Sequence, residues 1–135
     1  MKTAETISFD AQAASALQFL ADRIDTPTLD GFIERLFALA AELECITCRY
    51  AEERIRIDSK DRVLHEMAFP RSKSALRMVC ARLAVLCKEW SNENVNPYGD
   101  HLSVHVPSEK HAFVVTFENT PAQQSITIEL SRDDS

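Results

Sequence analysis

The sequence predicts an α+β protein in which helices pack on one face of an antiparallel sheet that ends in a C-terminal three-stranded meander. Two patterns lead to this prediction. Apolar residues recur with helical spacing over residues 72–90, and three segments after residue 100 alternate apolar with polar residues, as strands with one buried face do. An apolar helix face and an apolar sheet face must each be covered, so we expect them to cover one another.

Length and composition indicate one globular domain spanning residues 1–135, with 45% hydrophobic and 27% charged residues. The longest uninterrupted apolar run, residues 36–41, is far shorter than the roughly 20 residues that a membrane-spanning helix needs, so no membrane partner is expected. The first residues form no apolar leader, and the four cysteines form no dense disulfide pattern. We therefore expect a cytoplasmic protein with free thiols.

Two helices are expected in the N-terminal third. Residues 10–24 carry apolar residues at helical spacing after Asp10, a plausible N-cap, and a second helix begins near Leu29 after the turn at Pro27. Six apolar residues then recur at spacings of 4, 3, 4, 3 and 4: Phe32, Leu36, Leu39, Leu43, Ile46 and Tyr50. On a continuous helix they form one stripe, which is either core or a seam between two copies.

The stripe leaves two alternatives open. If it is a seam, or if the sheet has an open edge, the protein is a homodimer. The β-branched pair Ile46 and Thr47 also permits another outcome, in which the helix stops near Glu44 and residues 46–50 form a strand.

A short strand-like segment, Thr-Ile-Ser-Phe at residues 6–9, precedes the two helices. The apolar residues of the helices that carry the pattern are Leu17, Leu20, Ala21, Phe32, Ile33 and Leu36. Over residues 5–43 this arrangement resembles the ribbon-helix-helix family of DNA-binding regulators, in which two short strands pair across a dimer and enter the major groove. The resemblance implies an alternative function as a DNA-binding regulator.

The remaining elements follow from local patterns. Residues 54–69 predict a hairpin with a turn at residues 58–61, and the helix over 72–90 follows Pro70, with Ser72 or Ser74 as its N-cap. After a loop at residues 91–100 come the three strands of the meander. Pairing Val104 with Phe113 and Val115 with Ile128 places all their apolar side chains on one face. These side chains are Leu102, Val104, Val106, Phe113, Val115, Phe117, Ile126, Ile128 and Leu130.

Charge is segregated along the chain. Residues 1–48 hold three basic and eight acidic groups, residues 49–88 hold ten and five, and residues 89–135 hold two and eight, so a net charge of +5 lies between arms of −5 and −6. The acidic N-terminal arm would repel phosphates, which makes nucleic acid an unexpected partner. At the start of the helix over 72–90, four side chains predict a site for a small anion: Arg71, Ser72, Lys73 and Arg77.

Motifs for catalysis and cofactor binding are sparse. Two glycines exclude the glycine-rich loops that cradle phosphates, and the C-x-x-C formed by Cys45 and Cys48 lacks partners at zinc spacing, so no cofactor or metal is expected. His101 and His105 share the polar face of one strand and leave a small enzyme as a further alternative. Because no nucleophile with an orienting partner accompanies them, the leading prediction is a non-catalytic interaction or regulatory module.

Overall fold

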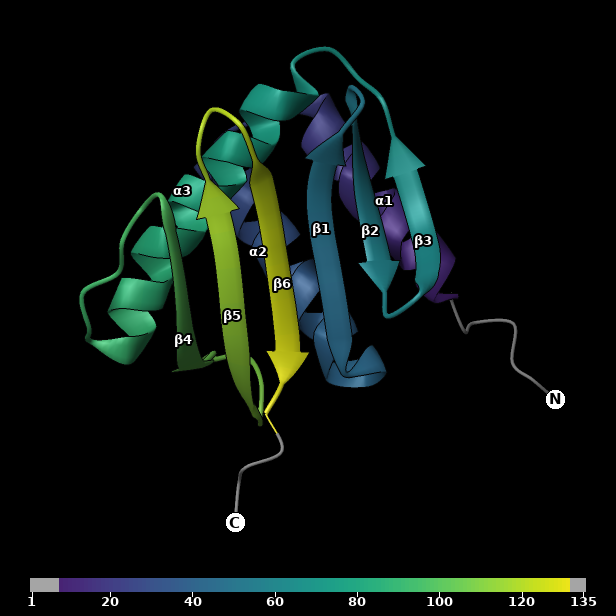
Figure 1. Cartoon of the computed structure of the whole chain (residues 1–135). Coiled ribbons are helices and arrows are strands. Elements are labelled where there is room, and N and C mark those ends of the chain that lie inside the picture. The colour runs from purple at the N-terminus through teal and green to yellow at the C-terminus, as the bar shows by residue number, and fades with distance from the viewer. Residues whose placement is uncertain (1–7, 132–135) are drawn as a thin grey trace, which may run out of the picture.

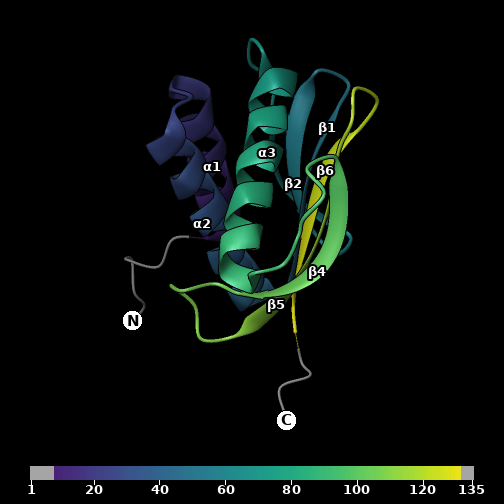
Figure 2. The same cartoon turned by 90° about the vertical axis from the view of Figure 1, so that its left-hand side faces the viewer.

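The computed structural model describes residues 8–131 and shows three helices on one face of a six-stranded antiparallel sheet (Figure 1). The helices are α1 (Phe9–Asp22), α2 (Thr26–Leu43) and α3 (Ser72–Ser91). The strands are β1 (Cys45–Ala51), β2 (Arg54–Ser59), β3 (Arg62–Met67), β4 (Gly99–His105), β5 (Ala112–Asn119) and β6 (Gln124–Leu130). Their order across the sheet is β3-β2-β1-β6-β5-β4. Figure 2 shows the helical layer beside the sheet, which confirms the predicted fold class.

The N-terminal helices begin at side chains that accept hydrogen bonds from their first turns. Ser8 caps α1 by accepting from the backbone N–H of Ala11, and Asp25 caps α2 by accepting from the N–H of Thr28. The prediction of Asp10 as the first cap is therefore wrong, since Asp10 lies inside the first turn of α1. A carboxylate at that position still faces the positive end of the helix dipole.

Residues 46–50 are part of strand β1, which settles the alternative that the sequence left open. Glu44 ends α2 in a left-handed conformation with φ 77° and donates its N–H to the carbonyl of Ala40. Ile46 and Cys48 then point into the core, while Thr47 and Arg49 lie on the opposite face. β1 pairs with β2 on one side and with β6 on the other, so it joins the two halves of the chain into one sheet.

The predicted C-terminal meander is confirmed in its register. Val104 pairs with Phe113, and Val115 pairs with Ile128. Their side chains are buried, and α3 packs across the inner face of β4, β5 and β6 and reaches β1 and β2. The predicted hairpin is also present as β2 and β3, with a bulge in which Leu64 is the extra residue.

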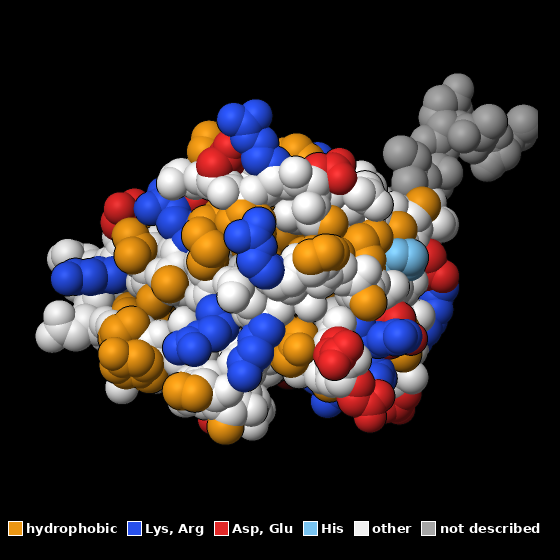
Figure 3. All heavy atoms as spheres, turned by 90° about the horizontal axis from the view of Figure 1, so that it is seen from above, with side chains coloured by type: hydrophobic (Ala, Val, Ile, Leu, Met, Phe, Trp, Pro, Cys, Tyr) orange, Lys and Arg blue, Asp and Glu red, His pale blue; other side chains and the backbone are white. Residues whose placement is uncertain are grey.

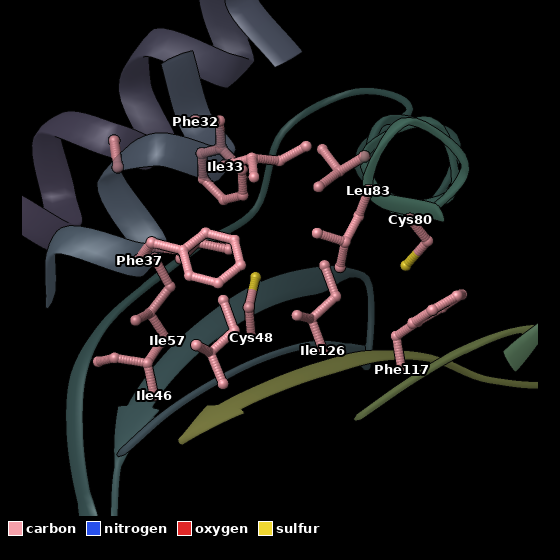
Figure 4. Packing of buried hydrophobic residues seen from close by; sticks show 14 of the residues in the cluster. Phe32, Ile33, Phe37, Ile46, Cys48, Ile57, Cys80, Leu83, Phe117 and Ile126 are labelled. Carbon is pink, nitrogen blue, oxygen red and sulfur yellow. The ribbon is translucent and has the colours of Figure 1, made fainter. Parts of the chain in front are cut away.

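The apolar stripe lies in the core of the monomer. Phe32, Leu36, Leu39 and Ile46 are at most 1% exposed, and Leu43 and Tyr50 are half-buried. Figure 4 shows side chains of α2 and α3 meeting those of β1, β2, β5 and β6. On the same helix, Phe37 makes edge-to-face contacts with Trp90 and Phe113 at 5.6 and 5.1 Å between ring centroids. Four of the six residues of the stripe are therefore enclosed in the core and are not available for a seam between copies.

The ribbon expected from the ribbon-helix-helix resemblance is not formed by Ser8 and Phe9, because Ser8 caps α1 and Phe9 begins it. The expected strand residues Thr6 and Ile7 lie outside the described residues. The two helices are present, but Leu17, Phe32 and Leu36 pack in this chain's own core. A ribbon-helix-helix dimer would instead use such residues between two copies.

Candidate interaction surfaces

The four residues predicted to hold an anion gather at the start of α3, but two of them are already engaged. Ser72 does not cap the helix, because its hydroxyl donates to the carbonyl of Glu53 at 3.4 Å. Arg77 donates Nε–H to Oδ1 of Asn119 at 3.3 Å, and the amide of Asn119 donates back to the carbonyl of Arg77. Arg71 occupies the N-cap position in a left-handed conformation with φ 61°. Its side chain makes no capping hydrogen bond to the first turn of the helix. Arg77 keeps four further N–H donors on its terminal nitrogens, whereas the hydroxyl proton of Ser72 is already donated to Glu53.

Ion pairs neutralise most of the basic segment from residue 49 to residue 88. Six of its ten basic residues lie within 4.0 Å of a carboxylate oxygen: Arg49, Arg54, Arg56, Lys60, Arg62 and Arg82. Three of these partners, Asp10, Asp30 and Glu44, come from the acidic N-terminal arm. Four basic residues have no ion pair within residues 8–131: Arg71, Lys73, Arg77 and Lys88. Three of the four therefore lie at the N-cap or in the first two turns of α3.

Two shallow pockets adjoin these cations. One, of about 530 Å³, is lined by Tyr50, Glu53, Ala68, Phe69, Pro70, Arg71, Ser72 and Lys73. The other, of about 320 Å³, is lined by Ala21, Asp22, Arg23, Ile24, Pro70, Arg71, Ser74 and Met78. Because Pro70 and Arg71 line both, the two pockets form one surface, which we name the α3-start surface. Figure 3 views this end of the molecule and shows hydrophobic side chains interspersed with Lys and Arg.

A second surface is the outer edge of strand β4. Within residues 8–131, β4 is the last strand of the sheet and pairs only with β5. Asp100 accepts a hydrogen bond from the backbone N–H of His101, so that N–H points away from β5. Alternate residues of a strand direct their backbone groups to the same side, so Ser103 and His105 also present N–H and C=O groups at the edge. The sequence carries a signal for this edge, since residues 101–105 contain no Lys, Arg, Asp, Glu or Pro.

The two histidines of the predicted enzyme alternative lie on the open face of β4. His101 and His105 are exposed, and Nδ1 of His101 lies 2.6 Å from the hydroxyl of Thr116 on β5. The neighbouring side chains on this face include Ser103 and Glu129, both exposed. Both histidines are thus exposed to solvent, whereas most ligand sites lie in enclosed pockets.

The cysteines do not form a shared site. Cys45 and Cys48 are three residues apart on a strand, so their side chains point to opposite faces of the sheet. Burial raises the pKa of Cys80 and of Cys87 to about 12, and it also raises the pKa of Cys48. These thiols therefore stay protonated and unreactive at neutral pH. No group of three metal-ligating side chains gathers within residues 8–131.

Comparison with known proteins gives no further assignment. No protein-family model matches the chain, and no curated protein sequence matches it. Among the described residues, no helix combines the length and the apolar character needed to span a bilayer.

Proposed function

We propose that the protein is a non-catalytic interaction or regulatory module of the cytoplasm that pairs with a second copy of itself through edge strand β4. The observation that supports this proposal is a strand edge that carries one charged residue, Asp100 at its start, and no charge, proline or bulge over residues 101–105. An exposed edge invites another strand unless charges, prolines or bulges interrupt it. Residues 101–105 have none of these in their sequence, and the β4–β5 register runs without a shift from Gly99 to His105.

A symmetric antiparallel pair is centred on Ser103. The groups that face the edge belong to His101, Ser103 and His105, so Ser103 lies opposite its counterpart and His101 lies opposite His105 of the second copy. The N–H of His101 then exchanges its bond to Oδ1 of Asp100 for one to the second copy. Opposite residues of this kind exchange both backbone hydrogen bonds. Because all three side chains are exposed on the open face, pairing requires no rearrangement of the core.

Charge substitutions at Ser103 test this register. Ser103→Lys and Ser103→Glu each place like charges opposite one another across the pair, so each variant alone should dissociate tenfold or more readily than the wild type. An equimolar mixture should form a heterodimer, because unlike charges then face each other. Analytical ultracentrifugation over a range of concentrations measures both effects.

Ser103→Gln is the control, because it adds length without charge and should keep the wild-type association. A wild-type protein that stays monomeric at micromolar concentration would refute the proposed dimer. Dimers of Ser103→Lys as stable as those of the wild type would refute pairing through β4, as would failure of the mixed variants to associate.

A further inference from the structure

We infer that the α3-start surface binds an acidic segment of a partner protein, with an apolar side chain of that segment seated in one of the two pockets beside Pro70 and Arg71. The surface lies on α3 and its neighbouring loops, apart from the β4 edge. The inference deepens the proposed role as an interaction module by naming a partner chemistry, and its test does not require the dimer.

The first argument is the distribution of charge. The chain has a net charge of −6, and six of the ten basic residues between 49 and 88 are paired with carboxylates. Arg71 and Lys73 are nevertheless exposed and have no ion pair in the described part of the chain. Arg77 adds a third positive charge one turn further along the same helix. This surface therefore complements acidic side chains.

The second argument is the apolar lining between the charges. Phe69 and Tyr50 contribute half-buried rings to one pocket, while Ile24 and Met78 contribute aliphatic surface to the other. Met78 is 45% exposed, and a flexible thioether adapts to differently shaped side chains. Apolar anchors in pockets, surrounded by polar contacts, are the common anatomy of protein interfaces.

A peptide fits these observations better than a membrane or a nucleic acid does. Each pocket also has one carboxylate in its lining, Glu53 or Asp22. The linings hold only two cations without an ion pair among the described residues, Arg71 and Lys73, and Arg77 lies one turn further along α3. A polyanion gains its affinity from many phosphate contacts, and the acidic remainder of this protein would oppose them. A short segment needs two or three ion pairs and one or two apolar anchors, which this surface offers.

Fluorescence anisotropy with a labelled peptide in which Glu alternates with Leu and Phe tests the inference on the full chain. The peptide should bind, and Lys73→Gln should weaken the affinity about fivefold, as expected for one interfacial ion pair. Met78→Ser should weaken it by a similar factor because it removes an apolar wall of one pocket. Repeating the titrations with Ser103→Lys separates this surface from the β4 contact, since that variant should bind the peptide as the wild type does.

Matched controls lie further along the same helix. Lys88→Gln removes the other unpaired lysine of α3, and Val85→Ser removes a side chain that is 47% exposed, so both variants should leave the affinity unchanged. The inference is overturned if the peptide does not bind or if the controls weaken binding as much as their counterparts. It is also overturned if a Glu-only peptide, phosphatidylglycerol vesicles or single-stranded DNA binds more tightly than the mixed peptide.

Discussion

The two edge strands of the sheet differ in how they are protected. β3 is packed against α1, contains a bulge at Leu64, and exposes Arg62 and Glu66, both of which form ion pairs. β4 has an unshifted register and, after Asp100, no charged residue. The β3 edge therefore carries more of the features that discourage a further strand than the β4 edge does.

This difference shows that the protection of an edge strand depends on the surrounding fold as well as on the sequence of the strand itself. The protection of β3 depends on a helix 52 residues earlier in the chain, as Arg62 reaches Asp10 of α1 at 2.6 Å. On β4, the corresponding acidic residue Asp100 accepts hydrogen bonds from its own neighbours, the backbone N–H groups of Asn96 and His101, and α3 packs on the inner face of the sheet (Figure 2). An interaction module needs such an asymmetry, since two open edges would favour continued polymerisation.

Replacing one leucine by alanine in each edge strand should give the largest difference in stability between the two edges. Leu64 of β3 is 4% exposed, so Leu64→Ala should lower the free energy of unfolding by about 2–4 kcal/mol through lost burial and the cavity left behind. Leu102 of β4 is half-buried, so Leu102→Ala should cost less, about 1 kcal/mol. Urea denaturation measures both values. An equal or larger loss at Leu102 would show that the inner side of β4 is as fully packed as that of β3.

Much of this fold follows from periodicity within single segments. The meander register was predictable because a shift by one residue would turn Val104 and Val115 out of the core. The long helix α3 was predictable because its apolar face is continuous. The pairing of β1 with β6 was not predictable, because it joins Ile46 to Ile128 across most of the sequence and no local pattern specifies that partner.

The candidate surfaces were predictable only in part. The sequence indicated the cations Arg71 and Lys73 at the start of a helix, and the structure places them beside two pockets. It did not indicate that Ser72 and Arg77 bond to Glu53 and Asn119, since these partners lie far away along the chain. It also could not show that the stripe from Phe32 to Tyr50 divides between a helix and a strand. Ile46 and Tyr50 are four residues apart, and this spacing fits one face of a helix and one face of a strand equally well.

The bulge between β2 and β3 should lower the free energy of unfolding by a measurable amount, and the regular pairing of β4 with β5 has no such bulge. Asp58 lies at the register shift, and burial raises the pKa of its carboxyl above the ordinary 3.8, although Arg56 and Arg49 oppose the shift. Its Oδ1 is buried without a hydrogen-bond partner in the described residues. A folded-state pKa above the unfolded value means that stability is lost as pH rises through the folded pKa.

Asp58→Asn should therefore be more stable than the wild type at pH 7, by less than about 1 kcal/mol because the two arginines lose their partner. The advantage should vanish as pH falls below about 3.8, where the carboxyl is protonated in both states. Thermal unfolding at a series of pH values measures the difference. An advantage that persists at low pH would assign the effect to packing instead of charge.

The smallest change in stability is expected from removing the exposed ion pair that contributes to the protection of β3. The side chains of Arg62 and Asp10 are 62% and 48% exposed, so water and salt screen their attraction despite the short contact. Arg62→Gln should lower stability by about 0.5 kcal/mol or less and leave the self-association unchanged, as measured by urea denaturation and by ultracentrifugation. Higher-order oligomers of this variant would show that a surface charge, and not the packing of α1, keeps the β3 edge closed. In that case a single lysine placed on β4 should close the open edge as well, which Ser103→Lys already tests.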